Sequence, residues 1–426
     1  MNLVIWHHDA FPTAPGVYLD AFPRRGHRVT WVIATEGDRH RTLVREAGGV
    51  RTVEIQRPRD TRLPRPFGAI VNRWHKLVRL FAKAYWMNRL AAERPDVLQV
   101  RDQLAEAVLA RFFTRLHGVP FAYQWDFPHF EARLHLLAQS GKRRPLLGLG
   151  MRSLIALRAS ILRGADLVLP ISEGQALVAQ RRYGVAAARL VPFPVGVAPE
   201  ETRRARAGTP HPRAAAIAGQ PVLCYLGNLE AMRQPTLIFE VFAAVLEEMP
   251  EARILLVGGT NPSVERLLDR FPGRDRMVLT GRVPHADVAA TLATARVGVF
   301  PIPIDDPFDI YRTSSPLKVV EYMASGLPVV SSRVEDAERL LGESGGGVCV
   351  DNDPRLFARA VAAYLRDPER AAACGEKGRA YVERHRSFDA LARELEGAYE
   401  RLLATGRPAP ASAPASPHAL PARREV

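Results

Sequence analysis

The second half of the chain contains the stretch TSSPLKVVEYMASGLPVV, which runs from Thr313 to Val330. Its residue types predict a short helix with a fixed start, because Ser315 is a suitable N-cap and Pro316 suits the first helical position. Gly326 suits the left-handed conformation that often ends a helix. The apolar residues after Gly326 predict a buried strand. The stretch therefore predicts a helix followed by a strand, as in the repeating unit of an α/β protein.

The start of this helix has a chemistry suited to anions. Backbone N–H groups and the positive end of the helix dipole attract negative charge there, so a diphosphate could bind. Lys318, in the first turn, adds a full positive charge. Glu321 lies one turn further on much the same face and could accept hydrogen bonds from a ribose diol. The alternative interpretation is a surface helix that carries a Lys–Glu pair.

Short apolar runs alternate with longer helical patterns along the whole chain, which indicates βαβ units around parallel sheets. Several runs are apolar throughout, as expected for strands with helices on both faces of the sheet. The expected strands of the first half are Leu3–Trp6, Val29–Ile33, Val97–Val100, Phe121–Tyr123, Leu167–Pro170 and Leu190–Phe193. Those of the second half are Val222–Leu226, Arg253–Val257, Met277–Thr280, Val297–Phe300, Pro328–Ser331 and Gly347–Val350.

A chain of 426 residues is too long for one compact core, and the alternation restarts after a segment rich in Arg, Ala and Pro. We therefore predict a first domain over 1–198, a linker over 199–219 and a second domain over 220–375. Two terminal helices have no strand after them, and we expect residues 376–405 to return to the first domain. Residues 406–426, rich in Pro, Ala and Ser, are expected to form a disordered tail.

Composition narrows the class of protein. Apolar residues make up 47% and charged residues 24%, which is typical of a folded protein. The sequence contains no uncharged apolar stretch of about 18 residues, so it predicts no membrane-spanning helix. The N-terminal run Met1–Trp6 has no basic leader, and it predicts a strand rather than a secretory signal. Three widely spaced cysteines argue against a disulfide framework and favour a reducing cytoplasm.

The motif SSPLKxxEYMAxGxPV resembles the donor-site signature of the retaining glycosyltransferases of family 4, also called group 1. Further matches follow in the family's order: RGHRV at 25–29, PDVLQVRD at 95–102, LPISE at 169–173, YGV at 183–185, PFPVGV at 192–197, LGNL at 226–229 and LLVG at 255–258. The resemblance covers about residues 1–403. It implies an α/β protein of the GT-B fold, with two facing Rossmann-like domains, parallel sheets and a C-terminal helix crossing back.

The resemblance also implies roles for individual residues of the second domain. Glu321 would bind the nucleotide ribose, and Lys318 would hold the diphosphate together with the backbone of Ser315, Pro316 and Leu317. Arg233 would neutralise the leaving nucleoside diphosphate, which is a form of electrostatic catalysis.

Three glycine or backbone positions complete the implied donor site. Gly16 resembles the glycine that lets backbone approach the donor phosphates. The alternative interpretation is that Gly16 is an ordinary turn glycine. Gly227 opens the second domain's first loop, and the backbone around Val283 would contact the nucleotide base.

The sequence departs from the family at three places. The first of two paired glutamates falls on Thr313, and Asp309 is a possible substitute for it. Asn228 stands where many members have an arginine. The family's histidine of the first domain aligns with Trp125, which makes Asp126 and His129 candidates for its role. A turn cap or a solvated loop is the alternative role for both.

The mechanism implied by the resemblance is front-face substitution with retention at the anomeric carbon, and it needs no enzyme nucleophile, unlike double-carboxylate glycoside hydrolysis. The substrates would be a UDP- or GDP-linked sugar and a glycan, lipid-linked or small-molecule acceptor, as in polysaccharide biosynthesis. The sequence shows no metal-ligand motif, and Asp305-Asp306 is interpreted as a loop start, so neither metal nor cofactor is expected. The departures keep a second hypothesis open: a catalytically degenerate nucleotide-sugar-binding or scaffold protein.

The formal net charge of +14 is concentrated in two stretches of the first domain. Residues 57–94 hold ten Lys or Arg and two acids, and residues 133–163 hold seven and none. Basic segments with interfacial aromatic residues, such as Trp74, Phe81, Tyr85 and Trp86, can rest on an anionic bilayer. Helices with solvated Arg faces are the alternative. No nucleic-acid-binding module is recognised, so no nucleic-acid partner is expected. The basic stretches and the few cysteines lead us to expect a cytoplasmic enzyme at the inner face of the cell membrane.

Overall fold

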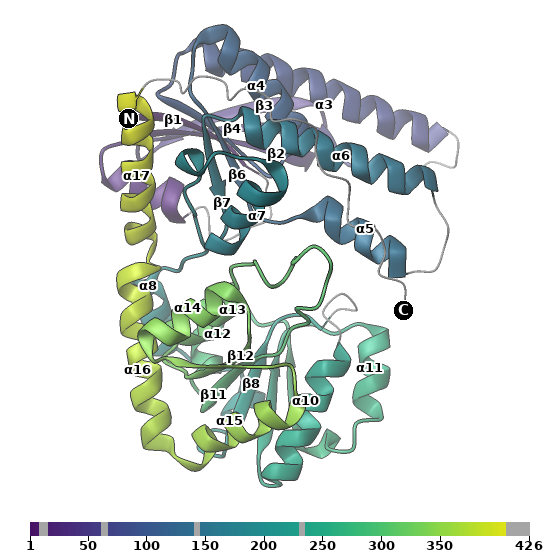
Figure 1. Ribbon diagram of the computed structural model, residues 1–426, viewed down its shortest axis with the longest axis vertical. Helices are drawn as coiled ribbons and strands as arrows, with labels where there is room; N and C mark the ends of the chain where they lie inside the picture. The colour runs from purple at the N-terminus through teal and green to yellow at the C-terminus, as the bar shows by residue number, and fades with distance from the viewer. Residues whose placement is uncertain (8–15, 61–66, 140–144, 230–234, 406–426) are drawn as a thin grey trace.

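The computed structural model describes residues 1–7, 16–60, 67–139, 145–229 and 235–405, which form two α/β lobes (Figure 1). Each lobe has a predominantly parallel sheet with helices packed against it. One helix at the C-terminus of the described chain runs from the second lobe onto the first (Figure 1). The predicted fold class is confirmed.

The first lobe contains a seven-stranded sheet in the order β3-β4-β2-β1-β5-β6-β7. Only β3 is antiparallel to its neighbour, β4. The strands are β1 Asn2–Trp6, β2 Arg28–Gly37, β3 Arg41–Ala47, β4 Val50–Pro58, β5 Val97–Arg101, β6 Phe121–Trp125 and β7 Leu167–Pro170. The helical elements are η1 Gly16–Ala21, α2 Phe22–Arg24, α3 Phe67–Ala92, α4 Leu104–His117, α5 His129–Gln139, α6 Pro145–Gly164, α7 Glu173–Tyr183 and η2 Ala187–Arg189.

Two strand predictions in this lobe need correction. The predicted strand Leu190–Phe193 is wrong, because only Leu190 forms an isolated bridge, to Val168. Pro192 and Pro194 have no N–H to donate to a ladder there. The hairpin of β3 and β4 was not predicted, since its strands mix polar and apolar side chains instead of forming a continuous apolar run.

The second lobe contains a six-stranded parallel sheet in the order β10-β9-β8-β11-β12-β13. Its strands are β8 Val222–Leu226, β9 Arg253–Val257, β10 Met277–Gly281, β11 Val297–Phe300, β12 Val329–Ser332 and β13 Gly347–Val350. All six were predicted to within a residue at each end. The helical elements are α10 Pro235–Glu248, α11 Pro262–Asp269, η4 Arg274–Arg276, α12 His285–Leu292, α13 Leu317–Ala324, α14 Glu335–Ser344 and α15 Pro354–Arg366.

The segment 199–219, predicted as a linker, is largely helical. It contains α8 (Pro199–Arg206) and α9 (Pro212–Ala215), and a proline at the start of each suits the first helical turn. Ala214 and Ile217 are buried in the core of the second lobe. This segment is therefore packed onto the second lobe.

The two terminal helices have different partners. α16 (Pro368–His385) packs against α13, α14 and α15 of the second lobe, whereas α17 (Phe388–Thr405) packs against η1 of the first. Leu391, Leu395 and Tyr399 of α17 are buried in the first lobe's core. The predicted return to the first lobe is thus made by α17. Residues 406–426, the predicted tail, lie outside the described residues.

Candidate functional site

Helix α13 is fixed against the second sheet by one tyrosine. Tyr322 is fully buried, and its hydroxyl accepts a hydrogen bond of 2.5 Å from the N–H of Leu226, at the end of β8. Its ring fills the space beside Gly298, where a Cβ would overlap it. Lys318 and Glu321 lie on the half-exposed side of the helix. By fixing α13 against the sheet, Tyr322 fixes the positions of Lys318 and Glu321.

The helix starts differently from the prediction. Pro316 rather than Ser315 is the N-cap residue, and it makes no side-chain cap. Ser315 Oγ instead donates to Asp336 Oδ2 at 2.6 Å and accepts from the N–H of Val195 at 3.3 Å. The predicted conformation of Gly326 is confirmed, with φ of +72°. Because no side chain caps the helix, its first turn stays suited to an anionic ligand.

Gly227 lies directly under Lys318. Its φ is +130°, in the range that favours glycine, and a Cβ would overlap the Lys318 side chain. Gly258, after the neighbouring strand β9, approaches the carbonyl of Gly227 equally closely. The ends of β8 and β9 thus meet the first turn of α13. Ligands of open α/β sheets bind at this carboxyl edge.

The charge of Glu321 depends on its surroundings. Burial raises the pKa of its carboxyl to about 7, and the nearby Lys318 ammonium opposes the rise. The group therefore changes its charge near neutral pH. If a ribose lay beside Glu321, only the carboxylate form could accept a hydroxyl hydrogen bond on each of its two oxygens.

Asn228 ties the loops after β8 and β9 together. Its Oδ1 accepts a hydrogen bond from the N–H of Gly259 at 3.0 Å. Val283, after β10, packs against the core of the second lobe. The structure places Val283 at the same sheet edge as Gly227. It leaves Asn228 in a structural hydrogen bond where many family members have an arginine.

Thr313 and Asp309 belong to the loop that precedes α13. Thr313 is buried, its carbonyl accepts from the Ser172 hydroxyl, and its own hydroxyl donates to the Asp309 carbonyl at 2.8 Å. Asp309 has a φ of +54° and is half-buried. Asp306 accepts hydrogen bonds from the N–H groups of Phe308 and Ile310, as expected of a loop start.

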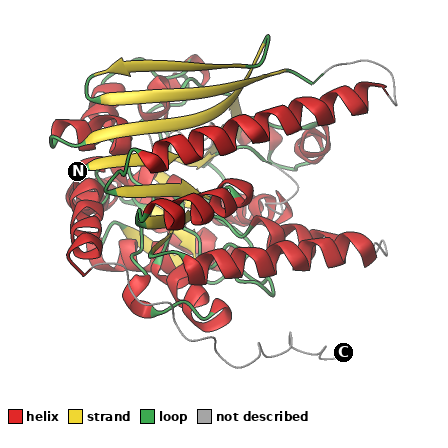
Figure 2. Cartoon of the chain, turned by 90° about the horizontal axis from the view of Figure 1, so that it is seen from above, coloured by secondary structure: helices red, strands yellow, loops and turns green. Residues whose placement is uncertain are grey.

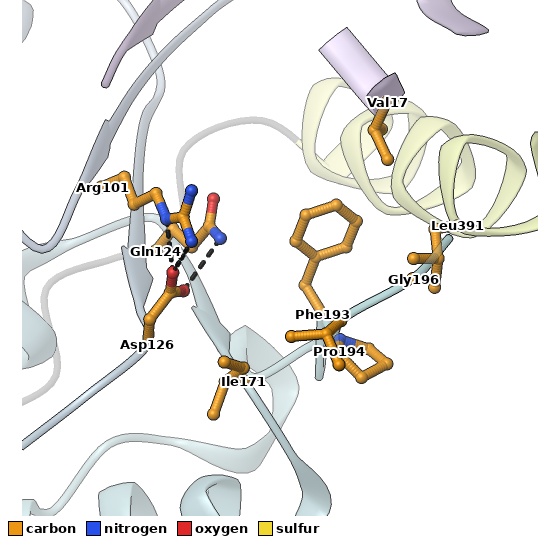
Figure 3. A pocket seen from close by; sticks show the side chains of 10 residues that line it. Val17, Arg101, Gln124, Asp126, Ile171, Phe193, Pro194, Gly196 and Leu391 are labelled. Carbon is orange, nitrogen blue, oxygen red and sulfur yellow. Dashed lines mark hydrogen bonds and ion pairs between the residues drawn. The ribbon is translucent and has the colours of Figure 1, made fainter. Parts of the chain in front are cut away.

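The two candidates of the first lobe lie in different environments. Asp126 is buried and forms an ion pair with Arg101, and Gln124 donates to it at 2.9 Å (Figure 3). Burial raises the pKa of Asp126, and the Arg101 guanidinium opposes that rise. Trp125, the aligned position, is buried in the core. Asp126 is therefore placed to orient Arg101 rather than to meet a substrate.

His129, in contrast, is accessible. Its side chain is 63% exposed, and its Nε2 lies 3.8 Å from Asp102 Oδ2. The carboxylate of Asp102 raises the pKa of His129. Asp102 also accepts a hydrogen bond from the N–H of Asp126 at 3.1 Å, which fixes the carboxylate between the two candidates. His129 thus presents an exposed imidazole at the carboxyl edge of the first sheet, and the Asp102 carboxylate favours its cationic form.

A small pocket lies beside Arg101, Gln124 and Asp126. Its free volume of about 20 Å³ suits a water molecule rather than a sugar. Figure 3 shows the side chains of Arg101, Gln124 and Asp126 on one side of it and Leu391 of α17 on another. We therefore regard the pocket as part of the support for the site.

The loop before α13 joins the lobes. Besides the bond between Ser172 and Thr313, Arg182 of α7 donates to the carbonyl of Pro307 at 3.3 Å. The rings of Phe127 and Tyr311 lie 6.5 Å apart between their centroids. The donor-side loop is therefore held close to the residues that flank His129.

Two predicted residues are not explained in this way. Gly16 begins η1, and a Cβ there would overlap the ring of Phe388 at the start of α17. The structure gives Gly16 a packing reason, and its contact with a phosphate stays a prediction. Arg233 lies outside the described residues.

Three residues of the site were missed by sequence reasoning. Asp102 directly follows a buried strand, a position that could have signalled it. Asp336 and Arg386 form a buried ion pair, and Asp336 also accepts the Ser315 hydroxyl. No local pattern marks that pair, because its partners are 50 residues apart. Within the described ranges, no three His, Cys, Asp or Glu side chains group as metal ligands would.

Two Rossmann-like lobes with parallel sheets, and a C-terminal helix that returns to the first lobe, define the GT-B class of fold. Residues 17–196 match the model of the glycosyl transferase 4-like domain, and residues 220–367 match that of the glycosyl transferases group 1. The chain belongs to the group 1 glycosyltransferases, family 4, as its motifs indicated.

Named relatives agree with this assignment. A D-inositol 3-phosphate glycosyltransferase of Segniliparus rotundus is 27% identical over 198 residues, 45% of this chain and 42% of that protein. The match thus spans less than half of the relative. Sucrose-phosphate synthase of Thermosynechococcus elongatus has a TM-score of 0.69 at 18% identity, over 95% of this chain and 99% of its own. Anabaena HepE, solved in complex with UDP, has a TM-score of 0.64 at 13% identity, over 94% and 100%.

Proposed function

We propose that this protein is a metal-independent retaining glycosyltransferase. It would move a sugar from a UDP- or GDP-linked donor to a glycan, lipid-linked or small-molecule acceptor. The observation that carries the proposal is the cluster of Gly227, Lys318 and Glu321 at the carboxyl edge of the second sheet. There the backbone of Gly227 meets the Lys318 ammonium, and the Glu321 carboxyl group lies one turn further along α13.

The donor would span this cluster. Its diphosphate would lie against the first turn of α13 and Lys318, and its ribose would donate hydrogen bonds to the Glu321 carboxylate. As the bond to the sugar breaks, negative charge grows on the leaving diphosphate, and a fixed ammonium stabilises it. We propose that Arg233 adds a second cation and that the donor's own phosphate oxygen takes the acceptor proton.

The first lobe would supply the acceptor side. We propose that His129 contacts the sugar or the acceptor, because it is exposed and positioned by Asp102. Asp126 would act through Arg101, since it is buried. The relatives support these substrates: one is a D-inositol 3-phosphate glycosyltransferase, and HepE was solved with UDP.

A donor panel tests the proposal. UDP- and GDP-sugars are offered with glycan, lipid-linked and polyol-phosphate acceptors, and nucleotide release is measured with and without EDTA. NMR of the product reports the anomeric configuration, which should match that of the donor. We expect Lys318→Met to lower kcat/KM by about 10²–10³. The control, Lys377→Met, changes an exposed lysine on α16 and should keep full activity.

One specific observation favours a second candidate function, a nucleotide-sugar-binding protein without turnover. Thr313 stands where the family has its first glutamate, and its polar groups are bonded within the protein. Tight donor binding by calorimetry, with no release from any donor–acceptor pair, would support the binding protein and exclude the enzyme.

We also propose where the protein works: in the cytoplasm, against the inner face of the cell membrane. The three cysteines are free thiols, which is compatible with a reducing compartment. A lipid-linked acceptor would be within reach of an enzyme at that surface.

A further inference from the structure

Helix α3 carries an apolar stripe that faces solvent. Its members recur every three or four residues and therefore lie along one side of the helix. The side chains are between 44% and 69% exposed: Phe67, Ile70, Trp74, Leu77, Phe81 and Tyr85. Soluble proteins rarely expose a continuous apolar stripe of this length without a use for it.

The opposite side of α3 holds the helix on the lobe. Trp86, Met87 and Leu90 are buried in the first lobe's core. These buried residues lie near the C-terminal end of α3, whereas the stripe extends to its N-terminal end. The exposed stripe is thus not an unfinished part of the core.

Neighbouring helices extend the apolar surface. Figure 2 shows α3, α4 and α6 running side by side. Phe112 and Leu116 of α4 are more than 60% exposed, as are Leu146 and Leu149 of α6. By length and composition α6 could cross a membrane, and only 28% of that window is buried. Because α6 also packs against α4, α5 and α7, it belongs to the folded lobe.

Cations border the stripe, and acids are absent from it. Neither α3 nor α6 contains an Asp or Glu. Arg73 is exposed beside the stripe, Arg89 is exposed one turn after Tyr85, and Arg152 is exposed on α6. Lys83 is excluded, because it pairs with Glu106, and so is Trp86, whose Nε1 donates to Thr42 Oγ1 at 3.2 Å. Of the four aromatic residues named from the sequence, Trp74, Phe81 and Tyr85 are exposed on the stripe and Trp86 is buried.

We propose that the α3 face, defined as the six-residue stripe with Arg73 and Arg89, docks on an anionic phospholipid bilayer. The apolar side chains enter the headgroup region while the cations meet lipid phosphates. Trp and Tyr favour this boundary, because each has an apolar ring and a polar atom. The cations and the absence of acids on α3 and α6 complement the negative charge of such a bilayer.

The docking surface lies on the first lobe alone. Figure 1 shows α3, α6 and α5 extending to the same side of that lobe, and α5 begins at His129. A docked protein therefore holds the acceptor side near the bilayer and leaves the second lobe free to bind donor. The inference rests on the proposed membrane location and is independent of the proposed chemistry.

Tryptophan fluorescence provides a direct readout. Of the five tryptophans, all of which lie in the described residues, Trp74 alone is exposed. With vesicles of phosphatidylcholine and phosphatidylglycerol at low salt, we expect the emission to shift to the blue and brominated lipid to quench it. Pure phosphatidylcholine or high salt should weaken the binding measured by co-sedimentation at least about tenfold.

Matched variants distinguish vesicle binding through the α3 face from non-specific binding. We expect Phe81→Ser and the pair Arg73→Gln, Arg89→Gln each to lower vesicle binding about tenfold or more, while turnover of a water-soluble acceptor stays unchanged. Leu267→Ser, at an exposed leucine on α11 of the second lobe, should bind like the parent. Equal binding to neutral vesicles would overturn the proposal. So would a Trp74 shift that follows protein concentration without lipid, which would mark the face as an interface between copies.

Discussion

At the scale of single residues, the candidate site combines a cation and a titrating acid on one helix. Lys318 lies over a glycine that has no side chain to displace it, and Glu321 lies where burial opposes its charge. The same residue types on an open surface would be an ordinary ion pair. At the carboxyl edge of the sheet they form a candidate ligand site.

The raised pKa of Glu321 predicts how donor binding depends on pH. Ribose hydroxyls donate to the carboxylate, so the Kd for UDP should fall as pH rises through about 7. The variant Glu321→Gln should bind more weakly and lose this dependence. Calorimetric titration between pH 6 and about 8 measures it. A parent protein with a flat profile would remove Glu321 from the ribose site.

The same shift predicts a change in stability without ligand. The folded-state pKa lies above the usual value of 4.5, so the stability it contributes is present below that value and is lost as pH rises to about 7. The loss is about 3 kcal/mol at most, taking about 1.4 kcal/mol per pH unit. Thermal unfolding of Glu321→Gln should therefore show a higher Tm than the parent above pH 7. An equal Tm would contradict the burial argument.

At the scale of elements, a buried ion pair connects α13 to the chain that crosses between the lobes. Arg386, at the end of α16, pairs with Asp336 of α14, which also accepts the Ser315 hydroxyl. Val197 and the segment 386–388 pair through two backbone hydrogen bonds of 2.9 and 3.0 Å. Helix α13 is thus connected to the two segments that cross between the lobes, at Val197 and at 386–388.

Breaking this pair should destabilise the protein strongly. Arg386→Met leaves Asp336 buried without its main cation, which typically costs about 3–5 kcal/mol. Urea unfolding measures the loss, and Arg384→Met, at an exposed neighbour, is the control. The double variant Arg386→Met, Asp336→Leu should recover part of the stability, because neither charge is then buried. A single variant as stable as the control would show that water already solvates Asp336.

At the scale of the whole molecule, α17 makes the first lobe depend on the end of the described chain. Leu395 is 1% exposed and packs in the same core as β1 and η1. The Tyr399 hydroxyl donates to Gln99 Oε1, deep in the first lobe. Residues about 300 positions apart therefore share one core.

Truncating that contact should unfold the first lobe more easily than the second. Leu395→Ala should cost about 2–5 kcal/mol, because it leaves a cavity under α17. Calorimetry should show a lower transition for the first lobe, while UDP still raises the transition of the second. Leu403→Ala, at an exposed leucine of the same helix, is the control. A shift of equal size in both transitions would mean that the lobes unfold together.

Several parts of the fold could be predicted because their signals are local. Strands β8 to β13 are short apolar runs between helices, and each run reveals itself within a few residues. The edge hairpin β3–β4 could not, because its strands mix polar and apolar side chains and form no continuous apolar run. Lys318 and Glu321 were proposed from their spacing and from the family resemblance. Asp336 and Arg386 were missed, since their contact joins distant segments.

The amino-acid sequence alone determined the alternation of strands and helices, the helix after Pro316 and the family. The elements follow from residue type and short-range spacing, and the family follows from the resemblance of the ordered motifs. Only the tertiary structure decided that Ser315 bonds to Asp336 instead of capping its helix, that Asp126 is buried while His129 is exposed, and that the stripe of α3 faces solvent. The reason is physical: burial and hydrogen-bond partners depend on which distant segments pack together, and local sequence does not record that.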